Sequence, residues 1–130
     1  MGLLPETMAQ YNHLPIFQRA YRLALETHRA VHQFPREHKY ALGAKLKEVA
    51  AQLLDLIVEA NSRTRKTEML EDARIVLERF RIHLRLASDL EILGLKRFEA
   101  FNRSVEEISK QLAGWLEWSK KTERAPADAV

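Results

Sequence analysis

Six basic side chains near the middle of the chain are spaced so that they could bind phosphate groups. Arg74, Arg81 and Arg85 follow one another at intervals of seven and four residues, which places them on one line of a helix. Arginine can bind phosphate oxygens bidentately, and a row of cations can contact successive phosphates of a nucleic acid. The basic residues that precede this row are Arg63, Arg65 and Lys66. We therefore expect the six residues to bind nucleic acid or a protein partner. The alternative is a solvated face on which Glu71 and Glu78 pair with the arginines.

Two other pairs of residues have a spacing that could support metal binding or acid–base catalysis. His28 and His32 lie one helical turn apart, but Arg29 stands where a metalloprotease helix carries its glutamate, so we expect His28 to be a buried core residue. Asp55 and Glu59 have the same spacing on an expected solvated face. The chain has no cysteine, no glycine-rich phosphate loop and no nucleophile motif. We expect no enzymatic activity, no metal, no cofactor and no small-molecule substrate.

Helices are the elements that must position these side chains. Apolar residues recur at steps of three and four over four segments, about 13–33, 37–60, 67–93 and 96–120. No proline interrupts the chain between Pro35 and Pro126. Thr67 is expected to cap the third helix, and Gly94 is expected to end it in a left-handed conformation. The pattern predicts an all-α fold, an antiparallel up-down four-helix bundle.

The chain has the size of one domain. In its 130 residues we expect a flexible N-terminus over 1–12, the bundle over 13–121 and a disordered tail over 122–130. No stretch has the apolar length of a signal peptide or a membrane span, so we expect a cytoplasmic protein without membrane contact. The 21 basic and 18 acidic residues leave a net charge of only +3. Nucleic-acid binding would therefore depend on where the charges lie.

Four apolar side chains lie outside the expected core seams and could form an oligomer interface. They are Ile75, Ile82, Leu86 and Trp118. The first three belong, with Leu93, to a second apolar stripe on the third helix. Because a four-helix bundle uses one face of each helix, we expect self-association through this stripe. The alternative is a wide core face.

The first helix repeats this pattern more weakly. Its expected core seam consists of Leu14, Phe17, Tyr21, Ala24, His28 and Val31. A second apolar stripe lies beside that seam and consists of Ile16, Leu23, Ala30 and Phe34.

Two short motifs are more specific than their composition requires. One begins the second helix and reads Phe34-Pro35-Arg36-Glu37-His38-Lys39-Tyr40-Ala41-Leu42-Gly43, and the other, in the fourth helix, reads Ala113-Gly114-Trp115-Leu116. In a four-helix chain of this length, the two motifs resemble the accessory variability determinant (Avd) family of diversity-generating retroelements, over about residues 14–120. A related family consists of bundle proteins encoded by intervening sequences of bacterial ribosomal RNA genes. Residues 53–61 lack the motifs typical of that sister family.

The resemblance implies a homopentameric barrel that binds the reverse transcriptase of the retroelement and template RNA or DNA through a basic surface. The reverse transcriptase performs the chemistry, and the accessory protein is required for the mutagenic copying of a target gene. A pentamer would repeat the arginine row around the assembly and so raise avidity without any new contact. The alternative function is an oligomeric scaffold of the intervening-sequence type that binds only protein.

Overall fold

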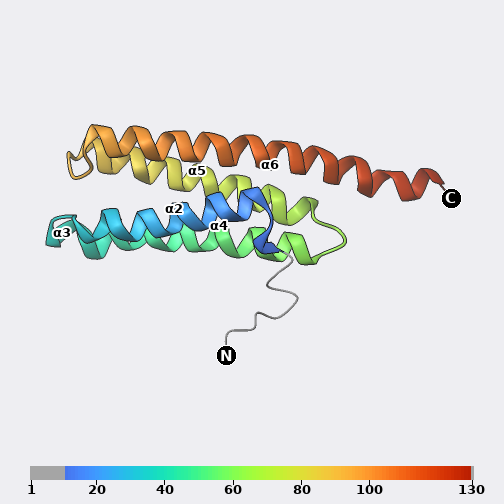
Figure 1. Ribbon diagram of the computed structural model, residues 1–130, viewed down its shortest axis with the longest axis horizontal. Coiled ribbons are helices and arrows are strands. Elements are labelled where there is room, and N and C mark those ends of the chain that lie inside the picture. The colour runs from blue at the N-terminus through green and yellow to red at the C-terminus, as the bar shows by residue number, and fades with distance from the viewer. Residues whose placement is uncertain (1–10, 130) are drawn as a thin grey trace, which may run out of the picture.

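All regular secondary structure in the described part of the chain is helical. The computed structural model describes residues 11–129 and the side chains of residues 11–124. The elements are α2 (Pro15–His32), α3 (Arg36–His38), the π-helical turn η1 (Lys39–Gly43), α4 (Ala44–Ser62), α5 (Thr67–Asp89) and α6 (Leu95–Ala129). Because α3, η1 and α4 are continuous, the chain forms four long antiparallel segments (Figure 1). Residues 11–129 contain no strand, and the expected all-α four-helix bundle is confirmed.

The hydrophobic core lies between the four segments, and α5 contributes the face that the sequence predicts. The members of this face are at most 1% exposed: Leu70, Ala73, Leu77, Phe80, Leu84 and Ala87. The ring of Phe80 meets that of Phe101 in α6 with a centroid distance of 6.2 Å. Burying a side chain of this size contributes about 1.5–3 kcal/mol. Contacts of this kind hold α6 against α5.

Helix α2 buries a different face from the expected one. Tyr21 is 55% exposed and His28 is exposed as well, so the prediction of a buried His28 is wrong. The residues that α2 buries are Ile16, Ala20, Leu23, Thr27, Ala30 and Val31. Thr27 is tolerated in the core because its hydroxyl donates a hydrogen bond of 2.6 Å to the carbonyl oxygen of Leu23. The buried face is therefore the second apolar stripe that the sequence indicates. Two small, weakly apolar residues, Ala20 and Thr27, complete it.

The motif that begins the second helical segment forms a close contact with α2. Phe34 and Gly43 are both buried, whereas Tyr40 between them is 76% exposed. A Cβ atom added to Gly43 would lie 2.6 Å from Cγ1 of Val31 and 3.3 Å from the carbonyl oxygen of His38. The turn η1 thus brings its backbone against α2 at a position where a Cβ atom would force its neighbours to shift.

Helix α5 ends in a Schellman motif whose left-handed residue is Glu91. Glu91 has a φ of 61°, its N–H donates to the carbonyl oxygen of Ser88, and the N–H of Ile92 donates to that of Ala87. Gly94 lies outside the left-handed region, so the prediction that it would end the helix is wrong. The helix ends at Asp89, earlier than expected, and Leu93 after the turn is buried, with 5% of its surface exposed.

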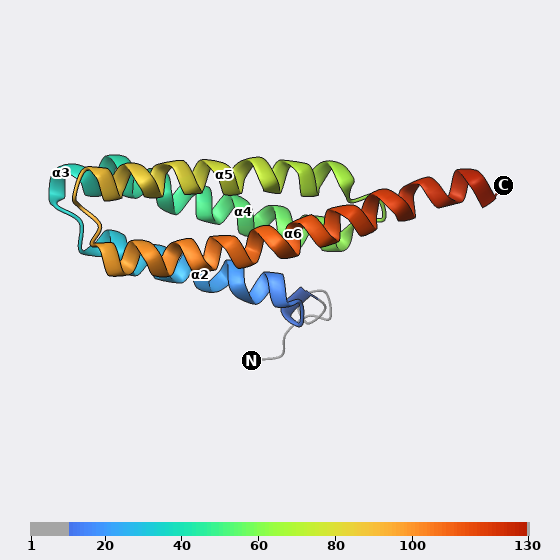
Figure 2. The ribbon, with the colours of Figure 1, turned by 90° about the horizontal axis from the view of Figure 1, so that it is seen from above.

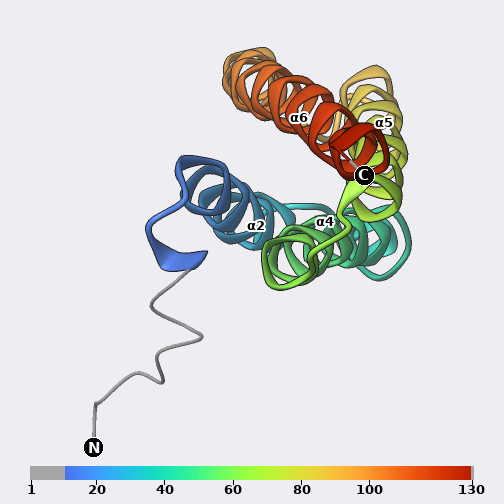
Figure 3. The same cartoon turned by 90° about the vertical axis from the view of Figure 1, so that its right-hand side faces the viewer.

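Helix α6 crosses the bundle diagonally. It begins beside α2 and reaches the first turn of α5 towards its other end (Figures 2 and 3). The helix continues to Ala129, so it extends through positions 122–129, where the sequence predicts a disordered tail. Residue 130 of that predicted tail lies outside the described residues.

A carboxylate of α6 caps the N-terminus of α5. Oε2 of Glu123 accepts hydrogen bonds from the backbone N–H groups of Lys66 (2.7 Å) and Thr67 (3.0 Å) and from the hydroxyl of Ser119 (2.7 Å). The predicted capping by the Thr67 side chain is wrong, because Lys66 occupies the cap position and no side chain of α5 itself caps the helix. An anion at this end also interacts favourably with the helix dipole. Hydrogen bonds to Glu123 therefore hold the end of the loop between α4 and α5 against α6.

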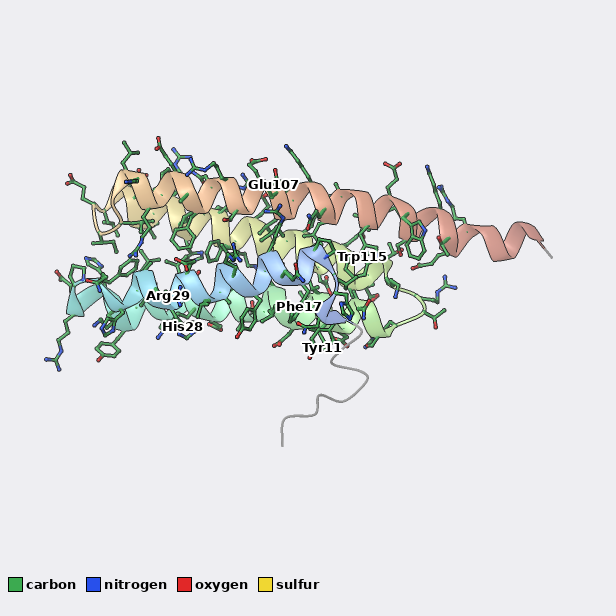
Figure 4. All side chains as sticks on the ribbon, viewed as in Figure 1. Tyr11, Phe17, His28, Arg29, Glu107 and Trp115 are labelled. Carbon is green, nitrogen blue, oxygen red and sulfur yellow. The ribbon has the colours of Figure 1, made fainter. Side chains whose placement is uncertain are left out.

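An aromatic contact packs the segment before α2 against that helix. The rings of Tyr11 and Phe17 have a centroid distance of 4.7 Å at the start of α2 (Figure 4). Residues 1–10, most of the N-terminus that the sequence predicts to be flexible, lie outside the described residues. Among the described helices, none has both the length and the apolar character that crossing a bilayer requires.

Candidate nucleic-acid interface

The basic residues between α4 and α5 differ in whether another group of the protein binds their charged end. The ammonium group of Lys66 donates to the carbonyl oxygens of Ala60 (2.9 Å), Asn61 (3.3 Å) and Arg63, which closes the C-terminus of α4. The guanidinium of Arg63 pairs with the carboxylate of Glu59 one turn back. Arg65 is exposed and makes no ion pair with any side chain that the structure describes. Lys66 therefore stabilises the loop, and Arg65 is the cation that the loop leaves available.

The central member of the arginine row on α5 connects two helices. The guanidinium of Arg81 lies 2.8 Å from Oε2 of Glu106 in α6 and 3.3 Å from Oε2 of Glu78. The hydrogen bond to Glu106 raises the pKa of Arg81, and the same bond lowers the pKa of Glu106. The carboxylates of Glu106 and Glu78 therefore compensate the charge of Arg81 before any ligand arrives.

The other two members of the row are exposed. Nε of Arg85 lies 3.8 Å from a carboxylate oxygen of Asp89, a contact that solvent screens. Arg74 makes no ion pair with the described side chains, although Glu71 nearby pairs with Lys120 of α6. The row therefore runs along a surface of mixed charge, and the six predicted residues do not act as one uniform basic patch.

A second group of cations lines a cleft between α2 and α6. Two adjoining cavities of about 330 and 320 Å³ share Arg22 and Ser104, so the cleft continues from one to the other. Its basic side chains are all exposed: Arg19, Arg22, Lys96 and Arg97. None of the four makes an ion pair with the side chains of residues 11–124. The one acidic side chain that lines the cleft, Glu26, already pairs with Arg29 at 2.7 Å.

The helix geometry adds to the positive potential of this cleft. Lys96 and Arg97 lie in the first turn of α6, which contains no acidic residue. The N-terminus of a helix carries a partial positive charge, so stability alone would favour acidic side chains there. The placement of two cations at this point therefore lowers helix stability and raises the attraction for anions.

The sequence did not indicate this cleft because its two halves are far apart in the chain. Arg19 and Arg22 belong to α2, whereas Lys96 and Arg97 begin α6. The only local signals are the neighbouring basic residues on one side of α2 and the basic pair after Gly94. Neither signal specifies which helices lie side by side.

The apolar residues that the sequence assigned to an interface are exposed in the single chain. Ile75, Ile82 and Leu86 are 54%, 63% and 46% exposed, and Trp118 is 53% exposed. The core of one chain therefore does not use them, and a wide core face does not account for them. Leu93, the last member of the second stripe, is buried instead.

The residue pairs with metal-binding or catalytic spacing lie on the surface. His28, which Figure 4 places on α2 beside Arg29, is exposed, as is His32. Asp55 and Glu59 are exposed on α4, as the sequence predicts. Among the described side chains, no three histidine or acidic residues converge in a way that could hold a metal ion.

Comparison with known families identifies the family to which this bundle belongs. Residues 14–119 match the family model described as bAvd-like, and no curated protein sequence matches the chain. The match extends from the residue before α2 to Ser119 in α6 and includes both the segment around Gly43 and the Gly114-Trp115 pair. The chain therefore belongs to the bAvd-like family.

Proposed function

We propose that the protein is the accessory subunit of a diversity-generating retroelement. In this proposal it binds the reverse transcriptase of that retroelement and the template RNA or DNA, and it supports mutagenic copying in the cytoplasm without catalysing a reaction itself. Membership of the bAvd-like family is the observation that carries the proposal. The exposed cations that lack an acidic partner among the described side chains support the nucleic-acid part of it.

The proposed assembly is a homo-oligomer, with a pentamer as the form that the family resemblance implies. The exposed stripe of Ile75, Ile82 and Leu86 supports this part, because three large apolar side chains on one helix face favour burial against another chain. Arg74 and Arg85 are exposed beside this stripe and are candidates for contact with the reverse transcriptase.

Two measurements test the proposed function. The reverse transcriptase of the same retroelement, coexpressed with an affinity tag, should retain this chain on the resin. The purified chain should also bind template RNA with a logarithmic association constant that falls linearly with the logarithm of salt concentration. A chain that neither copurifies with the enzyme nor binds RNA at low salt would overturn the proposal.

A protein scaffold without nucleic-acid binding is the second candidate function. The observation in its favour is that Lys66 and Arg81, two of the six predicted basic residues, are engaged inside the protein. A scaffold predicts retention by the reverse transcriptase together with no salt-dependent binding of RNA. The same two measurements therefore separate the candidates.

A further inference from the structure

We propose that the cleft between α2 and α6 is the site at which this protein binds single-stranded nucleic acid. This inference rests on the proposed function and adds to it the place of binding and the form of the strand. The phosphate contacts are assigned to the four exposed cations of the cleft, which are Arg19, Arg22, Lys96 and Arg97.

The charges of the cleft are the first argument. Four basic side chains from two helices line it, against one glutamate that already has a partner. Cations that face each other without acidic partners repel one another and gain stability when an anion lies between them. A chain of phosphates is such an anion, and guanidinium groups can contact its oxygens bidentately.

The shape of the cleft is the second argument. It consists of two adjoining cavities that share Arg22 and Ser104, and a continuous cleft of this kind suits a linear polymer. The cavity nearer the start of α6 is lined by the apolar residues Leu23, Ala100 and Phe101 as well as by cations. A single strand offers phosphates to the cations and unpaired base faces to an apolar surface, whereas a duplex keeps its bases stacked inside.

The arginine row on α5 is the weaker candidate for this ligand. Arg81 is bound to Glu106 and Glu78, and Arg85 lies near Asp89. A phosphate there would have to compete with these carboxylates, whereas the one carboxylate that lines the cleft, that of Glu26, already pairs with Arg29. The row is therefore better suited to a protein partner, whose surface can supply charges of both signs.

Two matched substitutions on α6 test whether the nucleic acid binds in the cleft. Ala100 lines the cleft, whereas Ala113 is exposed on the same helix and does not line it. Ala100→Glu should weaken binding of a short fluorescein-labelled oligouridylate by at least about tenfold, because the carboxylate repels the phosphates inside the cleft. Ala113→Glu changes the net charge equally and should leave the affinity nearly unchanged. Circular dichroism and urea unfolding confirm that both variants fold.

A second pair of variants tests the phosphate contacts. Arg22→Gln combined with Arg97→Gln should reduce the slope of log K against log salt by about 1.4, since a single strand loses about 0.7 for each phosphate contact. The matched control is Arg74→Gln combined with Arg85→Gln on α5, which should leave that slope unchanged. The wild-type chain should also prefer oligouridylate to its duplex with oligoadenylate.

The possible results separate this inference from the proposed function. If the wild type binds no RNA, the nucleic-acid part of the proposed function is wrong. If it binds RNA but the α5 variants or Ala113→Glu weaken binding as much as the cleft variants do, the cleft assignment is wrong and the proposed function stands. Cleft variants that bind RNA as tightly as the wild type, with an unchanged salt slope, would also overturn the cleft assignment. Equal affinity for the duplex would overturn the single-strand assignment.

Discussion

At the scale of single residues, two glycines of this chain differ in the space around them. Gly43 packs its backbone against Val31, so that an added Cβ would lie 2.6 Å from a methyl carbon. Gly114 lies within α6, and an added Cβ there would meet no atom within 4 Å. Both belong to motifs that carry the family resemblance, but only Gly43 has a steric reason to be glycine within the single chain.

Gly43→Ala should lower the free energy of unfolding by about 1–3 kcal/mol, because η1 and α2 must separate to admit the methyl group. Gly114→Ala is the matched control and should raise the free energy of unfolding by about 0.5–1 kcal/mol, since alanine favours the helix. Urea titration followed by circular dichroism measures both. A Gly43→Ala variant as stable as the wild type would show that the contact is easily relaxed.

At the scale of elements, one carboxylate joins the end of α6 to the start of α5. The hydrogen bond from Ser119, together with the N–H groups of Lys66 and Thr67, lowers the pKa of Glu123 to about 2 from its ordinary value of 4.5. A carboxyl group with a lowered pKa in the folded state stabilises the fold above its ordinary pKa. That contribution is lost as the pH falls from about 4.5 through about 2.

Glu123→Gln should therefore unfold at a lower urea concentration than the wild type at neutral pH. The difference between the two midpoints should be constant above pH 4.5 and should shrink as the pH approaches 2. Glu117→Gln is the control, because Glu117 is exposed and contacts only Lys121 among the described side chains. Parallel pH profiles of wild type and Glu123→Gln would contradict the capping role.

At the scale of the whole molecule, the exposed stripe on α5 is the surface from which an assembly would be built. Ile82 is its most exposed member at 63%, so a substitution there should leave the single-chain fold within about 0.5 kcal/mol of the wild type. Burying an unpaired glutamate in an interface, in contrast, is strongly unfavourable.

Ile82→Glu should therefore dissociate the oligomer into folded monomers, as sedimentation velocity would measure. Leu25→Glu is the control, since Leu25 is a partly exposed apolar residue of α2 that lies outside the stripe. An unchanged assembly in Ile82→Glu would exclude the stripe as the interface, and a monomeric wild type would exclude it without any variant.

The sequence by itself determined the four helical segments, the core face of α5, and the family. Helical periodicity is a local property, and α5 carries an apolar side chain at every core position, so its buried face could be identified before packing was known. The motifs around Gly43 and Gly114 are likewise readable from a single chain, and the match over residues 14–119 confirms the family that they indicate.

Only the tertiary structure decided which stripe of α2 is buried and which basic residues keep a free charge. Ala20 and Thr27 join the core because of what packs against them, not because of their own hydrophobicity. Arg81 finds Glu106 on another helix, whereas Arg22 and Arg97 meet across a cleft without an acidic partner among the described residues. Charge pairing depends on distances between helices, and those distances follow from how the helices cross rather than from their periodicity.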